Sequence, residues 1–83
     1  MELIFSKNAL KNLKKLSVDD RRRVVQKIKY YSQLDDPLQY AEPLVRHSIG
    51  EYRFRIGDYR AIFDYADNKI TVLKIGHRRD IYK

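Results

Sequence analysis

The chain has 83 residues, enough for a single domain over residues 1–83 with a thin core and little room for an enclosed cavity. Its 18 basic residues exceed its 11 acidic residues and give a formal net charge of +7, which attracts polyanions such as nucleic acid. The absence of cysteine excludes disulfides and thiolate chemistry, and no stretch is apolar enough for a signal peptide or membrane helix, so we expect a cytoplasmic protein without membrane contact.

The first half of the chain is predicted to be helical after a short strand at residues 3–5. Ser6 can cap a helix over about residues 7–16. Ser17 can cap a second helix, which the Asp36-Pro37 pair ends. The predicted buried stripes hold Leu10, Leu13 and Leu16 in the first helix, and Val24, Val25, Ile28, Tyr31 and Leu34 in the second.

The second half of the chain is predicted to form strands joined by tight turns. Strands are expected near residues 44–47, 52–56, 59–66 and 70–76. Gly57 and Asp58 suit a two-residue type II′ turn, because glycine accepts positive φ at its first position, and a three-residue loop is expected at residues 67–69. Helices followed by this meander predict an α+β fold, with two N-terminal helices packed on a small antiparallel sheet.

One face of the predicted hairpin collects arginine. Counting across its turn pairs Arg55 with Arg60, so Arg53 lies on the same face as both. The opposite face holds Tyr52, Phe54, Ile56, Tyr59, Ala61, Phe63 and Tyr65. Like charges placed opposite one another destabilise a sheet unless solvent screens them or an anion bridges them, and phosphate suits the fork of arginine. The pattern favours an anion-binding face, with a solvated sheet face as the alternative interpretation.

The last strand extends this face. Leu73 and Ile75 are expected to join the core face, which requires the three-residue loop and places Lys74, Gly76 and Arg78 with the arginines. His77 at the strand end has two interpretations, a packing residue or an RNA-binding one, and His47 is a weaker functional candidate. No cluster of histidine and carboxylate residues has metal-ligand spacing, so neither a metal nor a cofactor is expected.

The segments YRFRIGDYRAIF, residues 52–63, and IGHRRDIY, residues 75–82, resemble the RelE/ParE toxin superfamily, as does the order of elements. The resemblance covers nearly the whole chain. It implies the toxin of a toxin–antitoxin pair that enters the ribosomal A site and cleaves mRNA without a metal. The ribose 2′-oxygen attacks the adjacent phosphate, which gives a cyclic phosphate and a free 5′-hydroxyl. It also implies a RelB-like antitoxin that wraps the toxin, often displacing a C-terminal segment.

The resemblance also implies which residues act. The functional positions of the family fall on Arg53, Arg55, Arg60, Arg78 and Tyr82. We expect Arg60, Arg78 and Tyr82 to be catalytic, with the two arginines stabilising the charge of the pentavalent phosphate. RNA binding is assigned to Arg53, Arg55, Lys74 and His77.

The general base stays open in this interpretation. Some relatives carry lysine at the positions of Arg53 and Arg55, and arginine remains protonated. The remaining titratable candidates are His77, Tyr82 and Glu51, unless orientation and charge stabilisation suffice. Two other functions also remain open: a ParE-like toxin that binds DNA gyrase without cutting RNA, and a non-catalytic RNA- or ribosome-binding module. ParE-type members generally lack the full set of arginines and tyrosine, which favours the ribonuclease.

Overall fold

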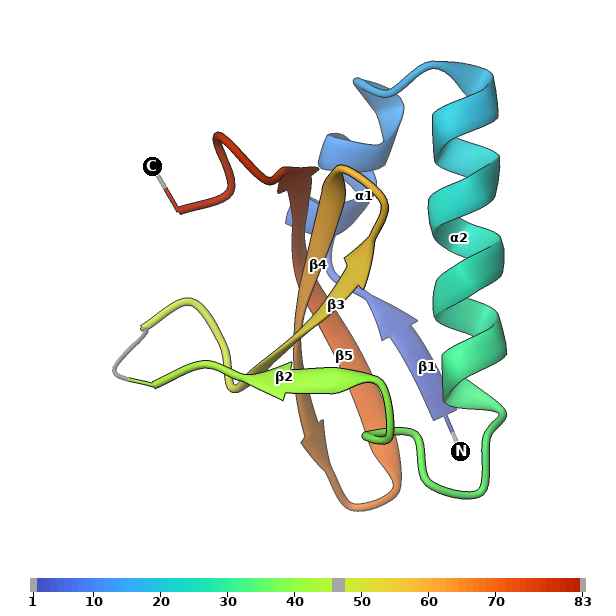
Figure 1. Ribbon diagram of the computed structural model, residues 1–83, viewed down its shortest axis with the longest axis vertical. Coiled ribbons are helices and arrows are strands. Elements are labelled where there is room, and N and C mark those ends of the chain that lie inside the picture. The colour runs from blue at the N-terminus through green and yellow to red at the C-terminus, as the bar shows by residue number, and fades with distance from the viewer. Residues whose placement is uncertain (1, 46–47, 83) are drawn as a thin grey trace.

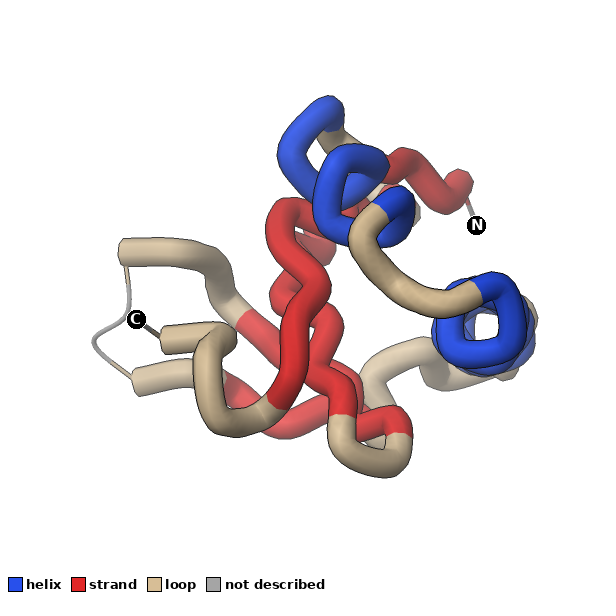
Figure 2. The backbone as a smooth tube through the Cα atoms, turned by 90° about the horizontal axis from the view of Figure 1, so that it is seen from above, coloured by secondary structure: helices blue, strands red, loops and turns tan. Residues whose placement is uncertain are grey.

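A computed structural model describes residues 2–45 and 48–82 as two layers, a five-stranded sheet and a pair of helices (Figures 1 and 2). The elements are β1 (Glu2–Phe5), α1 (Lys7–Lys14), α2 (Val18–Ser32), β2 (Ala41–Pro43), β3 (Tyr52–Ile56), β4 (Tyr59–Ala66) and β5 (Lys69–His77). The strands lie in the order β1-β5-β4-β3-β2. The predicted α+β class and the two N-terminal helices packed against the sheet are confirmed.

The sheet is mixed, whereas a purely antiparallel sheet was expected. Strands β2 to β5 form the predicted antiparallel meander, but β1 runs parallel to β5, with Glu2 beside Lys69 and Phe5 beside Val72. Parallel neighbours need a long connection, and here both helices and three strands lie between the two in sequence. Strand β2, at Ala41–Pro43, comes earlier in the sequence than the strand expected near residues 44–47. Two residues of that expected strand, Arg46 and His47, lie outside the described residues.

Both helices begin at the predicted serine caps. The Ser6 hydroxyl accepts a hydrogen bond from the Ala9 amide, and the Ser17 hydroxyl accepts one from the Asp20 amide. In α2 the predicted buried side is confirmed, with Val24, Ile28 and Tyr31 in the core and Val25 packed against it. Leu34 also packs there, but it follows the helix, which ends at Ser32 and so before the predicted Asp36-Pro37 pair.

The predicted stripe of α1 is wrong at one position. Ala9 and Leu13, one turn apart, face the core, whereas Leu10 is 48% exposed. Consecutive residues lie about 100° apart round a helix, so an eight-residue helix that buries Ala9 turns Leu10 towards solvent. Leu16 follows the helix and packs against the edge of the core.

The hairpin between β3 and β4 has the predicted register. Ile56 pairs with Tyr59, Arg55 with Arg60 and Phe54 with Ala61, around a Gly57 whose φ is +58°. The core therefore forms on the predicted face, where the Phe54 and Phe63 rings stack with centroids 4.2 Å apart. Helix α2 covers these rings, since Tyr31 lies 4.8 Å from Phe54, measured between ring centroids.

The turn between β4 and β5 differs from the prediction. It has two residues, Asp67 and Asn68, with φ values of 52° and 60°, as a type I′ turn requires. A register shift between Ile62 and Phe63 makes Leu73 an extra residue on β5. The prediction for Leu73 was therefore wrong: its side chain lies beside Ile62 on the outer face. The same bulge restores the expected placement of Lys74 and Gly76, which pair with Ile62 and Arg60.

A hydrogen bond from Tyr59 Oη to Asp20 Oδ2, 2.9 Å long, ties the start of β4 to α2. This bond, together with burial, raises the pKa of Tyr59 above its ordinary value of 10.0. Its contribution to stability is therefore present below about pH 10 and is lost as the pH rises through the folded pKa. We expect Tyr59→Phe to lower the free energy of unfolding by about 1 kcal/mol at neutral pH, and by less in strongly alkaline buffer. Urea titrations at the two pH values measure this, and equal stabilities at neutral pH would refute it.

Candidate functional site

The outer face of the sheet, away from the helices, carries the residues that the sequence grouped. Arg53 and Arg55 project from β3 and Arg60 from β4, opposite Arg55. Arg78 and Tyr82 lie on the segment that follows β5, drawn in red beyond the end of that strand in Figure 1. We call the surface formed by these five residues the arginine face. These are five of the seven residues to which the sequence assigned function; the other two are Lys74, on the same side of the sheet, and His77, on the opposite side.

Arg60 lies at the centre of this face and is only 7% exposed. Its Nη1 donates to the carbonyl oxygens of Gly57 and Tyr59, at 2.9 and 2.8 Å, which fixes the guanidinium against the hairpin turn. Within residues 2–45 and 48–82, no carboxylate forms an ion pair with it.

The electrostatic surroundings of Arg60 are unfavourable for its own charge. Burial lowers the pKa of Arg60, and the positive charges of Arg55, Arg53 and Arg78 lower it further. Arginine nevertheless remains protonated at physiological pH. The buried, charged side chain of Arg60 is thus repelled by three other arginines. An anion bound among these four side chains would reduce that repulsion.

Arg53 connects three elements of the site. Its Nε donates to Glu42 Oε1 on β2 at 3.2 Å, and its Nη1 donates to the hydroxyl of Tyr82. Its guanidinium carbon also lies 5.8 Å from the centre of the Tyr82 ring. The hydrogen bonds to Tyr82 and Glu42 raise the pKa of Arg53. The side chain is thus oriented from both sides, and the partly exposed Tyr82 is held against the arginine face by its contact with Arg53.

Glu42 is the site residue that the sequence analysis missed. It pairs with Arg53 across β2 and β3, and its Oε1 also lies 3.7 Å from Arg55 Nε. The strand was expected at residues 44–47, which left Glu42 in a loop. A register that places Ala41–Pro43 against Tyr52–Phe54 would have set this carboxylate beside the arginines.

A tight turn returns the chain after β5 to the arginine face. The Arg78 amide donates to Asp58 O at 2.8 Å, and the exposed Arg78 guanidinium lies 3.8 Å from the Asp58 carboxylate. The amides of Asp80 and Ile81 both donate to His77 O. This turn places Tyr82 against Arg53, although the two are 29 positions apart in sequence.

Lys74 and His77 lie on opposite sides of the sheet. Lys74 pairs with Ile62 and shares the side of the arginines. His77 pairs with Tyr59, whose ring packs on the helix side, and the two rings meet edge-on with centroids 5.8 Å apart. Its Nδ1 accepts a hydrogen bond from the Arg79 amide. The structure therefore gives His77 a packing and hydrogen-bonding position and does not bring it to the arginine face.

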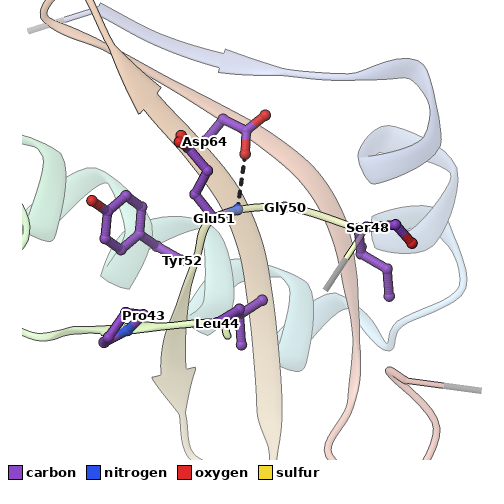
Figure 3. Close-up of a pocket in the computed structure, with 8 residues that line it drawn as sticks. Pro43, Leu44, Ser48, Gly50, Glu51, Tyr52 and Asp64 are labelled. Carbon is purple, nitrogen blue, oxygen red and sulfur yellow. Dashed lines mark hydrogen bonds between the residues drawn. The ribbon is translucent and has the colours of Figure 1, made fainter. Parts of the chain in front are cut away.

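A pocket beside the arginine face is lined by the loop between β2 and β3 (Figure 3). Asp64 Oδ1 accepts from the Glu51 amide at 2.9 Å, the dashed line in Figure 3, and the Glu51 carboxylate accepts from the Tyr65 amide at 3.2 Å. The two carboxylates thereby hold this loop on β4. Their negative charge disfavours a polyanion here, so we leave the pocket out of the candidate site.

The described residues contain no helix that is long and apolar enough to cross a membrane. Residues 2–45 and 48–82 contain no group of three or more histidine and carboxylate side chains that could hold a metal ion.

Comparison with known proteins agrees with this architecture. A family model described as the ParE toxin of the type II toxin–antitoxin system parDE matches residues 3–82. Toxin RelG of Mycobacterium tuberculosis is 38% identical over 50 residues, and this match spans 58% of either chain, a little over half the length of that relative.

Solved structures resemble nearly the whole chain. The RelBE2 toxin–antitoxin complex from Mycobacterium tuberculosis contains a chain with 26% identity and a TM-score of 0.77, over 95% of this chain and 92% of that one. The archaeal RelE–RelB complex from Pyrococcus horikoshii is similar in fold, with 24% identity, a TM-score of 0.72, and coverage of 95% and 96%. The match to the family model covers nearly the whole sequence, and the chain therefore belongs to the RelE/ParE family of toxins from type II toxin–antitoxin systems.

Proposed function

We propose that this toxin is an endoribonuclease that cleaves mRNA on the ribosome, in the cytoplasm. The observation that carries the proposal is the surroundings of Arg60, a buried cation with three further arginines acting on it and no described carboxylate paired with it. Such a site stabilises a phosphate more strongly as its negative charge grows towards the transition state. A surface that served solubility alone would not bury one of its arginines among others of the same sign.

The proposed reaction needs no group beyond the RNA, water and this chain. The ribose 2′-oxygen loses its proton and forms a bond to the adjacent phosphorus, while the bond from phosphorus to the 5′-oxygen breaks. The leaving 5′-oxygen takes up a proton from water, and a 2′,3′-cyclic phosphate remains. Arg60 and Arg78 stabilise the charge on the pentavalent phosphorus, and Arg53, Arg55 and Lys74 hold the RNA backbone. Tyr82 stacks on a base or orients the nucleotide.

Glu42 is our candidate acceptor for the 2′-proton. It is a carboxylate that pairs with Arg53 and Arg55 on the arginine face, whereas Glu51 lies in the loop held on β4 and His77 lies on the helix side. Tyr82 also lies on this face, but it is a phenol and its hydroxyl accepts a hydrogen bond from Arg53. Glu42→Gln keeps the size of the side chain but removes the proton acceptor, so we expect cleavage to fall about 10²–10⁴-fold. Ribosome binding measured in parallel should change little. Cleavage by the Glu42→Gln variant at the wild-type rate would exclude this role.

The proposed partner that neutralises the toxin is a RelB-like antitoxin. One similar solved structure is described as a RelB–RelE antitoxin–toxin complex from Methanococcus jannaschii, and another as an archaeal RelE–RelB complex. The net charge of +7 suits an acidic or amphipathic antitoxin segment that covers the arginine face or its rim. A cognate antitoxin that binds while leaving this face open to the ribosome would contradict neutralisation by occlusion.

A second candidate function follows from the family match. The matching family is that of ParE toxins, and a ParE-like protein would bind DNA gyrase and block it without cutting RNA. The two functions are separated by primer extension on translated mRNA and a gyrase supercoiling assay, both run with the same purified protein. We expect new mRNA ends and unaffected supercoiling. Intact mRNA together with blocked supercoiling would replace the ribonuclease by the gyrase inhibitor.

A further inference from the structure

The segment of residues 78–82 carries two of the side chains that the proposed reaction uses, and it is held by an apolar contact outside the main core. Ile81 is only 1% exposed, yet it does not belong to the cluster between the helices and the sheet. It lies instead over Gly76 of β5. A Cβ built on Gly76 would lie 3.1 Å from Ile81 Cδ1 and 3.8 Å from its Cα.

Gly76 makes this close approach possible. It pairs with Arg60 across β4 and β5, on the outer side of the sheet. Most residues at this strand position would project a side chain into the space that Ile81 occupies. The missing side chain therefore lets the chain after β5 lie flat on the sheet, directly beside the strand position of Arg60.

The start of the segment is fixed by main-chain hydrogen bonds, and its end by Ile81. The Arg78 amide bonds Asp58 O at 2.8 Å, and the Asp80 and Ile81 amides bond His77 O at 2.9 and 3.0 Å. The next residue after Ile81 is Tyr82, whose hydroxyl accepts from Arg53. Any shift of Ile81 away from Gly76 is therefore passed directly to Tyr82, and it disturbs the turn that follows Arg78 through the hydrogen bond of the Ile81 amide.

We propose that Ile81, seated on Gly76, is a positioning residue that sets Arg78 and Tyr82 against Arg60 and Arg53. Ile81 presents only hydrocarbon and takes no part in the chemistry. Its effect on the reaction is geometric, because charge stabilisation and stacking depend on where the acting side chains lie. The inference rests on the proposed function for its kinetic consequence, but the packing of Ile81 on Gly76 can be tested without RNA.

The kinetic test uses single-turnover cleavage of mRNA on ribosomes. Ile81→Ala removes the side chain that packs on Gly76. We expect the cleavage rate at saturating toxin to fall about 10²-fold, which is typical when catalytic side chains such as Arg78 and Tyr82 are displaced by about an ångström. The toxin concentration that gives half-saturation should change little, since Arg53 and Arg55 remain on β3. Thermal unfolding measured on the same samples must show that the variant is folded at the assay temperature.

A compensating pair of substitutions makes the test specific to this contact. Gly76→Ala introduces a methyl group 3.1 Å from Ile81 Cδ1, a contact so tight that the Ile81 side chain must move by a few tenths of an ångström. Ile81→Val removes that same Cδ1 atom. We therefore expect Gly76→Ala to slow cleavage, and the double variant Gly76→Ala/Ile81→Val to recover most of the wild-type rate. A general loss of stability would instead add in the double variant.

A readout independent of the proposed function is trypsin cleavage after Arg78 and Arg79, followed by mass spectrometry of the C-terminal fragments. The seated segment should resist trypsin in the wild type, become sensitive in Ile81→Ala and Gly76→Ala, and regain resistance in the double variant. If the wild-type protein does not cut mRNA, the proposed function fails, and trypsin protection alone then tests whether Ile81 holds the segment on Gly76. Wild-type protection and rate in Ile81→Ala, or a double variant no better than Gly76→Ala, would overturn the inference.

Discussion

Replacing Arg78 by alanine is expected to slow mRNA cleavage about 10²–10³-fold on saturated ribosomes while leaving ribosome binding nearly intact. Arg78 is exposed and lies at the edge of the arginine face, where its charge contributes to the field that lowers the pKa of Arg60. A phosphate that gains charge in the transition state would feel this group more strongly than the ground state does. Single-turnover kinetics and a separate binding titration measure the two effects.

The chain offers a matched control next to Arg78. Arg79 is also exposed, and its amide donates to His77, which lies on the helix side and not on the arginine face, so Arg79→Ala should cleave at nearly the wild-type rate. Arg53→Ala should chiefly weaken association and flatten its salt dependence, because a phosphate contact acts largely through counterion release. If Arg78→Ala binds poorly yet cleaves normally at saturation, Arg78 is an anchor and not a catalytic group.

Replacing Arg60 by methionine is expected to lower the rate of mRNA cleavage by a similar factor, about 10²–10³, without destabilising the fold. The buried guanidinium is repelled by Arg55, Arg53 and Arg78, and its two hydrogen bonds are to carbonyl oxygens of the hairpin. Methionine fills a similar volume without the cost of a desolvated charge. We therefore expect a midpoint of thermal unfolding equal to or above that of the wild type.

This combination separates a functional residue from a structural one. A residue that serves the fold loses stability when it is replaced, whereas a residue kept for function at a cost in stability does the reverse. Calorimetry and cleavage should be measured on the same preparation. An Arg60→Met variant that unfolds would show that Arg60 organises the hairpin, and one that still cleaves would remove Arg60 from the reaction.

The central hairpin could be predicted from the sequence because every local signal agrees there. Alternation fixes which residues share a face, and Gly57 supplies the positive φ that a two-residue turn needs. The opposition of Arg55 and Arg60, on which the candidate site rests, follows from these two facts alone. The serine caps of both helices were equally readable, because each hydroxyl bonds an amide three residues away.

Features that depend on packing could not be predicted in this way. The bulge at Leu73 and the short β4–β5 turn have compensating effects on the register, so the pattern could not distinguish them from a longer loop. Strand β2 is three residues long and its sequence does not alternate, so neither its position nor that of Glu42 was evident. The burial of Ile81 depends on a contact with Gly76, which no local sequence pattern predicts.

The most direct test of the ribonuclease proposal is the chemistry of the ends that the purified protein leaves on mRNA in translating ribosomes. The proposed reaction predicts a 2′,3′-cyclic phosphate on the upstream fragment and a free 5′-hydroxyl on the downstream fragment. Polynucleotide kinase should label the downstream end without prior phosphatase treatment, and the Arg78→Ala variant should yield almost none of it. Intact mRNA, or fragments that begin with a 5′-phosphate, would contradict attack by the 2′-oxygen at the arginine face.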